Sequence, residues 1–121
     1  MSPDADDLLA RQLQQLRGEY LADADKRLAE LREIRAQLRT DALEALGRLR
    51  QAFHRLAGSG GSYGFPDISA NSREGEHVAQ RLQAAGASSS AADLDAIDAC
   101  IAGVDRAFRE AKAGFELDRP S

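Results

Sequence analysis

The chain has 121 residues, 43% of them hydrophobic, with four Phe, two Tyr and no Trp, which predicts one domain with a core of aliphatic side chains and alanine. A net charge of −4 argues against a nucleic-acid-binding protein, and the single Cys100 rules out an intramolecular disulfide or a multi-cysteine zinc site. The sequence has neither a signal peptide nor an apolar run long enough to span a bilayer, so we expect a soluble cytoplasmic protein without a membrane partner.

The N-terminal third predicts two helical segments, over residues 4–24 and 25–39. Apolar residues recur at helical spacing in both, at Leu9, Leu13, Leu16 and Tyr20 and then at Leu28, Leu31, Ile34 and Leu38. Gly18 interrupts the first run and is a candidate bend. The boundary between the segments is weakly marked, so a single kinked helix is the alternative.

Three further helices are predicted, over residues 41–61, 66–85 and 90–113. Asp41 with Glu44 and Ser90 with Asp93 have the spacing of helix N-terminal capping pairs, and Pro66 suits a first helical position. The chain after Gly114 is expected to fray. Seams with 3-4-3-4 spacing run along two of these helices, at Leu46, Leu49, Phe53, Leu56 and Gly60 and at Leu94, Ile97, Ile101, Val104 and Phe108. With no strand signal, residues 1–121 predict one all-α domain, an antiparallel up-down four-helix bundle with an additional N-terminal helical segment.

His54 stands out because Gly58 and Gly61 follow it at four and seven residues, on the same helical face. Glycine inside a helix costs roughly 0.5–1 kcal/mol relative to alanine, so the bare face suggests that something large approaches the imidazole. A neutral imidazole has a nitrogen free to act as a nucleophile, and nearby guanidinium groups stabilise phosphoryl charge. The alternative is a surface histidine without chemistry, beside glycines that end the helix. The stripe around His54 and its edges contain Gly47, Arg50, Gln51, Arg55, Ala57, Gly58 and Gly61.

The segment from His54 to Gly64 resembles the signature of histidine-containing phosphotransfer (HPt) domains, H-x-L-K-G-S-x-x-x-x-G. His54 matches the phosphoacceptor, and the four other matching positions are Leu56, Gly58, Ser59 and Gly64. The resemblance implies a four-helix bundle that carries phosphate between aspartates of receiver domains in a multistep two-component phosphorelay. It also implies that the partners are the receiver domains of a hybrid sensor kinase and of a response regulator, with Mg²⁺ on the receiver and no cofactor on this chain.

Three further positions compare with the family pattern. The family's usual lysine three residues after the histidine is Ala57 here, and Arg50 or Arg55 are the candidates to supply its charge. Glu76 falls where the family often places a polar residue bonded to the imidazole; the alternative is a solvated glutamate. Gly75 stands where the family usually has a larger apolar residue, and either weaker packing or room for the ring could follow.

Other chemistries are disfavoured by the sequence. His54 and His77 lack the i, i+4 spacing of a helical metal pair, so no metal site is expected. Ser59 and Ser62 lack the partners of a hydrolase triad, and the glycine-rich loop lacks the lysine of a phosphate-binding loop.

We therefore expect a monomeric phosphocarrier rather than a turnover enzyme. Its receiver-docking face is predicted to contain Arg50, Gln51, Arg55, Ala57, Gly58 and Gly61, with Leu8 or Leu9 as added apolar contacts. Two alternatives stay open. One is a helical module that binds receivers without transferring phosphate. The other is the phosphoacceptor domain of a chemotaxis-type histidine kinase, which would normally continue into dimerisation and ATP-binding domains.

Overall fold

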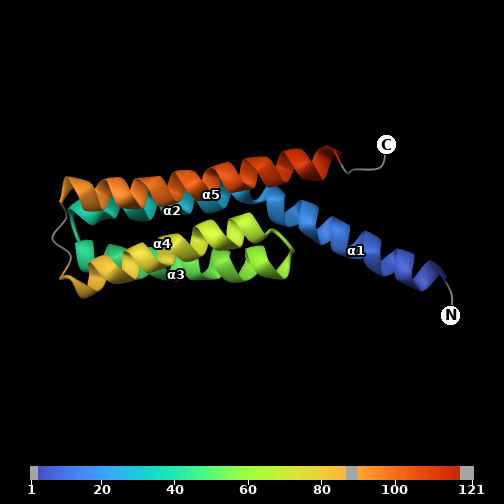
Figure 1. The fold of residues 1–121 in the computed structure, drawn as a ribbon, viewed down its shortest axis with the longest axis horizontal. Helices are drawn as coiled ribbons and strands as arrows, with labels where there is room; N and C mark the ends of the chain where they lie inside the picture. Colours follow the sequence, from blue (N-terminus) through green and yellow to red (C-terminus); the bar gives the residue numbers. More distant parts are fainter. Residues whose placement is uncertain (1–2, 87–89, 118–121) are drawn as a thin grey trace.

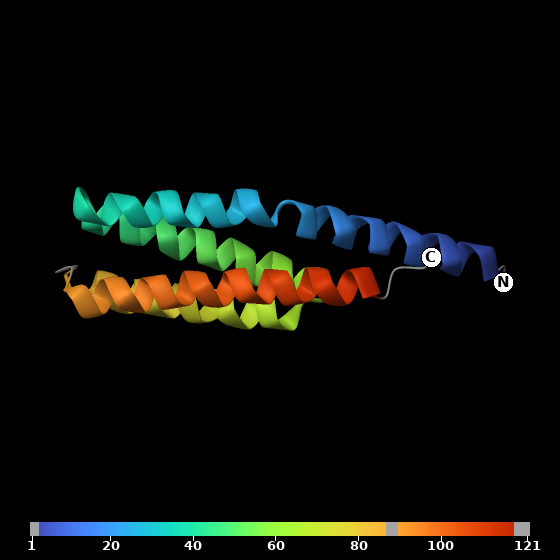
Figure 2. The same ribbon diagram turned by 90° about the horizontal axis from the view of Figure 1, so that it is seen from above.

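The computed structural model describes residues 3–86 and 90–117 and shows five α-helices in that part of the chain. They are α1 (Pro3–Ala22), α2 (Ala24–Ala36), α3 (Ala42–Ser62), α4 (Pro66–Ala84) and α5 (Ala91–Leu117), with a short 3₁₀ turn, η1 (Gln37–Arg39), after α2. Helices α2 to α5 form an up-down antiparallel bundle, and α1 projects from one end of it (Figures 1 and 2). The expected all-α bundle with an extra N-terminal helix is therefore confirmed. Among these described helices, none is both long and apolar enough to cross a membrane.

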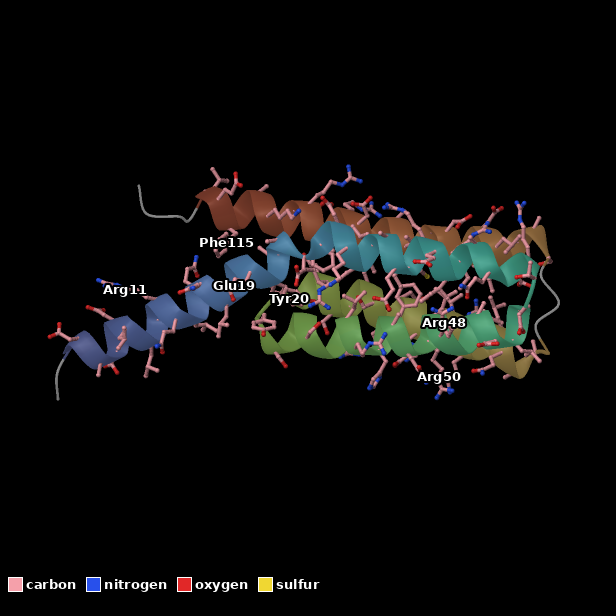
Figure 3. The ribbon with its side chains drawn as sticks, turned by 180° about the vertical axis from the view of Figure 1, so that it is seen from behind. Arg11, Glu19, Tyr20, Arg48, Arg50 and Phe115 are labelled. Carbon is pink, nitrogen blue, oxygen red and sulfur yellow. The ribbon has the colours of Figure 1, made fainter. Side chains whose placement is uncertain are left out.

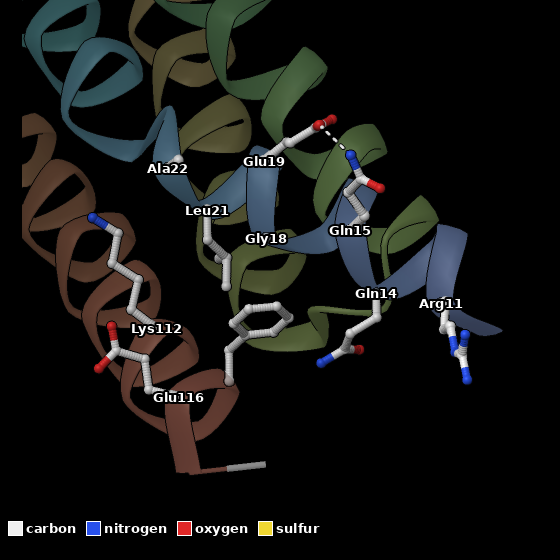
Figure 4. Close-up of a pocket in the computed structure, with 10 residues that line it drawn as sticks. Arg11, Gln14, Gln15, Gly18, Glu19, Leu21, Ala22, Lys112 and Glu116 are labelled. Atoms are coloured by element: carbon white, nitrogen blue, oxygen red, sulfur yellow. Dashed lines mark hydrogen bonds between the residues drawn. The ribbon is translucent and has the colours of Figure 1, made fainter. Parts of the chain in front are cut away.

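The break between α1 and α2 falls at Asp23, slightly before the predicted boundary. Its backbone N–H donates to Tyr20 O at 3.2 Å, as in a tight turn, and α2 begins at the next residue. Gly18 is not at the bend but inside α1 (Figure 4). A methyl group there would lie 3.1 Å from Cζ of Phe115 on α5. The small size of Gly18 therefore lets the two helices approach, and α5 continues to Leu117 rather than fraying after Gly114.

Helices α3 and α5 begin where their capping residues predict. Asp41 Oδ1 accepts a hydrogen bond from the Glu44 N–H at 3.3 Å. Ser90 and Asp93 bond reciprocally, each side chain accepting from the other residue's N–H at 3.1 and 3.3 Å. These bonds satisfy backbone donors that the first helical turn leaves free.

The core lies between α2, α3, α4 and α5, and all five residues of the predicted α3 seam are buried in it. Helices α3 and α4 pack closely, since a methyl group at Gly60 would lie 3.0 Å from both Ile68 Cγ2 and Ser69 N. The buried seam of α3, from Leu46 to Gly60, fixes the rotation of this helix and so decides which of its residues face outward.

Helix α1 joins the bundle near its C-terminal end, through Tyr20 (Figure 3) and through Arg17. The Tyr20 ring stacks on Tyr63 with centroids 4.8 Å apart, and its hydroxyl lies 2.8 Å from Ser59 Oγ. Arg17 Nε donates to Tyr63 O at 2.9 Å. The regular spacing of the α1 leucines does not lead to burial: exposure is 47–64% at Leu8, Leu9, Leu13 and Leu16.

Candidate functional site

His54 lies on α3 and meets Glu76 of α4 across the seam between the two helices. His54 Nδ1 is 2.6 Å from Glu76 Oε2. The imidazole is 76% exposed, whereas the carboxylate is 19% exposed. The structure thus brings together the two residues that the sequence proposed as a pair, with the ring at the surface and its partner half-buried beneath it.

The pairing decides which nitrogen of a neutral imidazole is available. A carboxylate only accepts hydrogen bonds, so Nδ1 must carry the shared proton. The other nitrogen, Nε2, then keeps its lone pair. On a ring this exposed, Nε2 is open to an approaching electrophile.

The position of His54 follows from the burial of its neighbour. Phe53 is fully buried in the core, and successive helical residues are rotated by about 100°. His54 is therefore held at the edge of the seam, where it can face both solvent and α4. In the same way, the buried Gly75 precedes the half-buried Glu76 on α4.

A shallow pocket beside His54 runs along the α3–α4 seam. The sequence predicted Arg50, Gln51 and Arg55 around the histidine but missed Gln80 and Gln83, which come from α4. Those two follow Glu76 at helical spacing, so the signal was present once Glu76 was placed on this face. The pocket is lined by Gly47, Arg50, Gln51, His54, Arg55, Glu76, Gln80 and Gln83.

The two arginines of the pocket differ in their surroundings. Arg55 Nη2 lies 3.2 Å from Glu30 Oε1 on α2, so its charge is partly balanced there. Arg50 forms no ion pair with any described residue and points away from the bundle (Figure 3). Arg50 is therefore the better placed of the two to meet an incoming anion.

The small residues after His54 fall on different faces. Gly58 is exposed, and a methyl group there would have no atom within 4 Å; Gly61 is exposed as well. Ala57, by contrast, is only 6% exposed, and its carbonyl accepts a hydrogen bond from Ser69 Oγ of α4 at 2.7 Å. The expectation that Ala57 lies on the exposed face is therefore wrong, because the third residue after His54 turns toward α4.

The other matching positions of the motif shape the end of α3. Leu56 is buried in the core, and Ser59 contacts Tyr20. Gly64 has φ of +82°, which favours glycine. Its N–H donates to Gly61 O at 3.1 Å, and the Phe65 N–H donates to Gly60 O at 2.7 Å. This is the Schellman pattern of a helix C-terminus.

The second histidine, His77, is exposed on α4 next to Glu76. Within the described ranges, no group of three or more His, Cys, Asp or Glu residues is placed to hold a metal ion.

Comparison with known proteins agrees with this geometry. A family model, the Hpt domain, matches residues 8–107, which include His54, Glu76 and most of the bundle. No curated protein and no solved structure matches the chain. The match covers most of the sequence, and the chain therefore belongs to the Hpt domain family, whose members perform histidine phosphotransfer in phosphorelays.

Proposed function

We propose that this protein is a phosphocarrier that accepts a phosphoryl group from a receiver-domain aspartate on Nε2 of His54 and passes it to a second receiver. One observation carries the proposal: the exposed imidazole is bonded to Glu76 through Nδ1, at 2.6 Å, and has its other nitrogen free. A nucleophile held in one tautomer and open to solvent is what such a transfer needs.

The transfer needs no further reactant, because every bond and charge that changes is accounted for by the two partners. Nε2 of His54 attacks the phosphorus of the aspartyl phosphate in line, the N–P bond forms, and the P–O bond to the aspartate breaks. The aspartate leaves as a carboxylate, and the positive charge gained by the imidazole is offset by the Glu76 carboxylate. The reverse sequence delivers the group to the next receiver. The chain is then an intermediate carrier and not a turnover enzyme.

We assign charge stabilisation mainly to the partner. Phosphoryl transfer depends on cations around the transferring oxygens, commonly Mg²⁺ with carboxylate ligands. In the described part of this chain only Glu76 supplies a carboxylate to the His54 pocket. The receiver would therefore bring the divalent cation, and Arg50 would add a cation from this side.

The docking face is proposed to centre on His54, with Arg50, Gln51 and the bare surface at Gly58 around it. A flat partner could approach Gly58 closely because nothing projects there. The exposed Leu8 and Leu9 of α1 could extend this contact. Leu9→Ala would then weaken transfer at limiting receiver concentration while leaving the bundle fold intact.

The proposal is tested by incubating a phosphorylated receiver with the wild-type protein and with His54→Gln. Phosphate on the protein is read on a gel that preserves acid-labile phosphoramidates. Label on the wild type and none on the variant supports the proposal. No label on either, across several receivers, would favour a binding module without transfer, and equal label on both would exclude His54 as the acceptor.

A further inference from the structure

The tightest contact near the site is between Gly75 of α4 and Phe53 of α3. A methyl group at Gly75 would lie 2.5 Å from Cε1, 2.6 Å from Cδ1 and 2.7 Å from Cγ of the Phe53 ring. Packed carbon atoms sit about 3.5–4.0 Å apart. Any side chain at this position would therefore have to displace the ring or push the helices apart by roughly 1 Å.

This contact directly adjoins the His54–Glu76 pair in both helices. Phe53 precedes His54 on α3, and Gly75 precedes Glu76 on α4. A helix is rigid over adjacent residues, so the separation set by the ring and the glycine also sets the separation of the imidazole and the carboxylate. Their atoms are 2.6 Å apart, and a parting of about 1 Å would exceed normal hydrogen-bond length.

The ring at Phe53 has little freedom to yield. It is fully buried and belongs to the core cluster with Leu49 and Leu56 on either side along the seam. Close packing resists added volume, because side chains leave their preferred rotamers or the backbone shifts. The displacement would consequently fall on α4, which carries Glu76.

We infer that Gly75 is a positioning residue, which brings α4 close enough for Glu76 to hold the Nδ1 proton of His54; the inference rests on the proposed function and names a further residue of that site. Gly75 contacts no reacting atom. It acts through Phe53, by keeping Nε2 as the unprotonated nitrogen.

Gly75→Ala tests the inference, with Gly114→Ala as its matched control. Gly114 also lies inside a helix, and a methyl group there meets no atom within 4 Å. The readouts are the imidazole ¹⁵N chemical shifts, which report the nitrogen that carries the proton, and the rate of transfer from a phosphorylated receiver. A merely structural role would lower stability without changing the tautomer of the folded protein.

In Gly75→Ala we expect the proton to redistribute from Nδ1 toward Nε2 and transfer to slow roughly tenfold, the usual size of losing an orienting partner. Gly114→Ala should match the wild type in both. A folded Gly75→Ala protein with the wild-type tautomer and rate would overturn the inference.

A double variant keeps the test decisive if Gly75→Ala does not fold. Phe53→Leu combined with Gly75→Ala replaces the rigid ring with a smaller side chain that can turn away from the new methyl group. It should fold and regain the Nδ1–H tautomer at least in part. Failure of the double variant to fold would overturn the inference, because the ring would then not be what the glycine accommodates.

The two proposals fail separately. If wild-type protein takes no phosphate on His54, the proposed function fails, whatever the tautomer. If wild type is phosphorylated and Gly75→Ala keeps the tautomer, only the role of Gly75 fails.

Discussion

Gly58 offers a substitution whose effects on stability and transfer should have opposite signs. It lies inside α3, one turn after His54, and a methyl group there meets no atom within 4 Å. Replacing an interior helical glycine with alanine gains about 0.5–1 kcal/mol when no clash offsets it. For a domain of this size that gain corresponds to a rise in Tm of roughly 2–5 °C.

The same methyl group would stand on the face that we propose for receiver docking. Displacement of reacting groups by about 1 Å can slow a reaction by up to roughly a hundredfold. We expect Gly58→Ala to slow transfer by at least about tenfold, through a receiver that cannot approach Nε2 closely.

Thermal unfolding followed by circular dichroism gives the stability, and label transfer under limiting receiver gives the rate. Gly114→Ala, distant along the chain on α5 and equally unobstructed, should leave the rate unchanged. If Gly58→Ala is more stable and transfers at the wild-type rate, the bare surface is not where the receiver docks. If it is less stable than the wild type, the reasoning about open space at Gly58 is wrong.

Three further substitutions test the packing around the site. Gly60→Ala should lower the free energy of unfolding in urea by about 1–2 kcal/mol, because its methyl group meets the Ser69 backbone N at 3.0 Å; unchanged stability would contradict that contact. Ser72→Ala should raise the free energy of unfolding by about 1 kcal/mol, because the buried hydroxyl has no hydrogen-bond partner among the described residues. A loss of stability would show that this hydroxyl does form a hydrogen bond. Burial raises the pKa of the Tyr20 phenol above its usual value of about 10. The neutral phenol therefore contributes fully to the free energy of unfolding below about pH 10, and this contribution is lost as pH rises through the raised pKa. Tyr20→Phe should therefore lose less stability than the wild type in alkaline urea titrations, and an identical decline would count against burial of the phenol.

The helices, and the starts of α3 and α5, could be predicted from sequence because their signals are local. The apolar residues from Leu46 to Gly60 recur with the period of a helix. Asp41 and Ser90 cap the helices whose first turns follow them. These patterns depend on neighbours a few residues away, which is the range over which a helix is specified.

The parts that sequence could not give depend on how one helix faces another. Ala57 and Gly58 flank the direction of His54 on the helix, about 60° to one side and 40° to the other. Only the packing of α4 decides that Ala57 is the buried one. The contact of Gly75 with Phe53 likewise depends on the axial register of two helices, which no periodicity within one helix contains.

The N-terminal helix shows the same limit in another form. The spacing of Leu9, Leu13 and Leu16 correctly indicates a helix with one apolar face. It carries no information about whether a partner covers that face, and in this structure all three remain exposed. Tyr20 is buried because the α3–α4 turn supplies Tyr63 and Phe65 as ring partners.

The central claim is that Nε2 of His54 carries the phosphoryl group. The most direct test is to phosphorylate the wild-type protein with a phosphorylated receiver and locate the modification by peptide fragmentation and ³¹P NMR. The account predicts a phosphoramidate on the peptide that contains His54, with phosphorus bonded to Nε2. Phosphate on His77, or on Nδ1 of His54 where Glu76 binds, would contradict it.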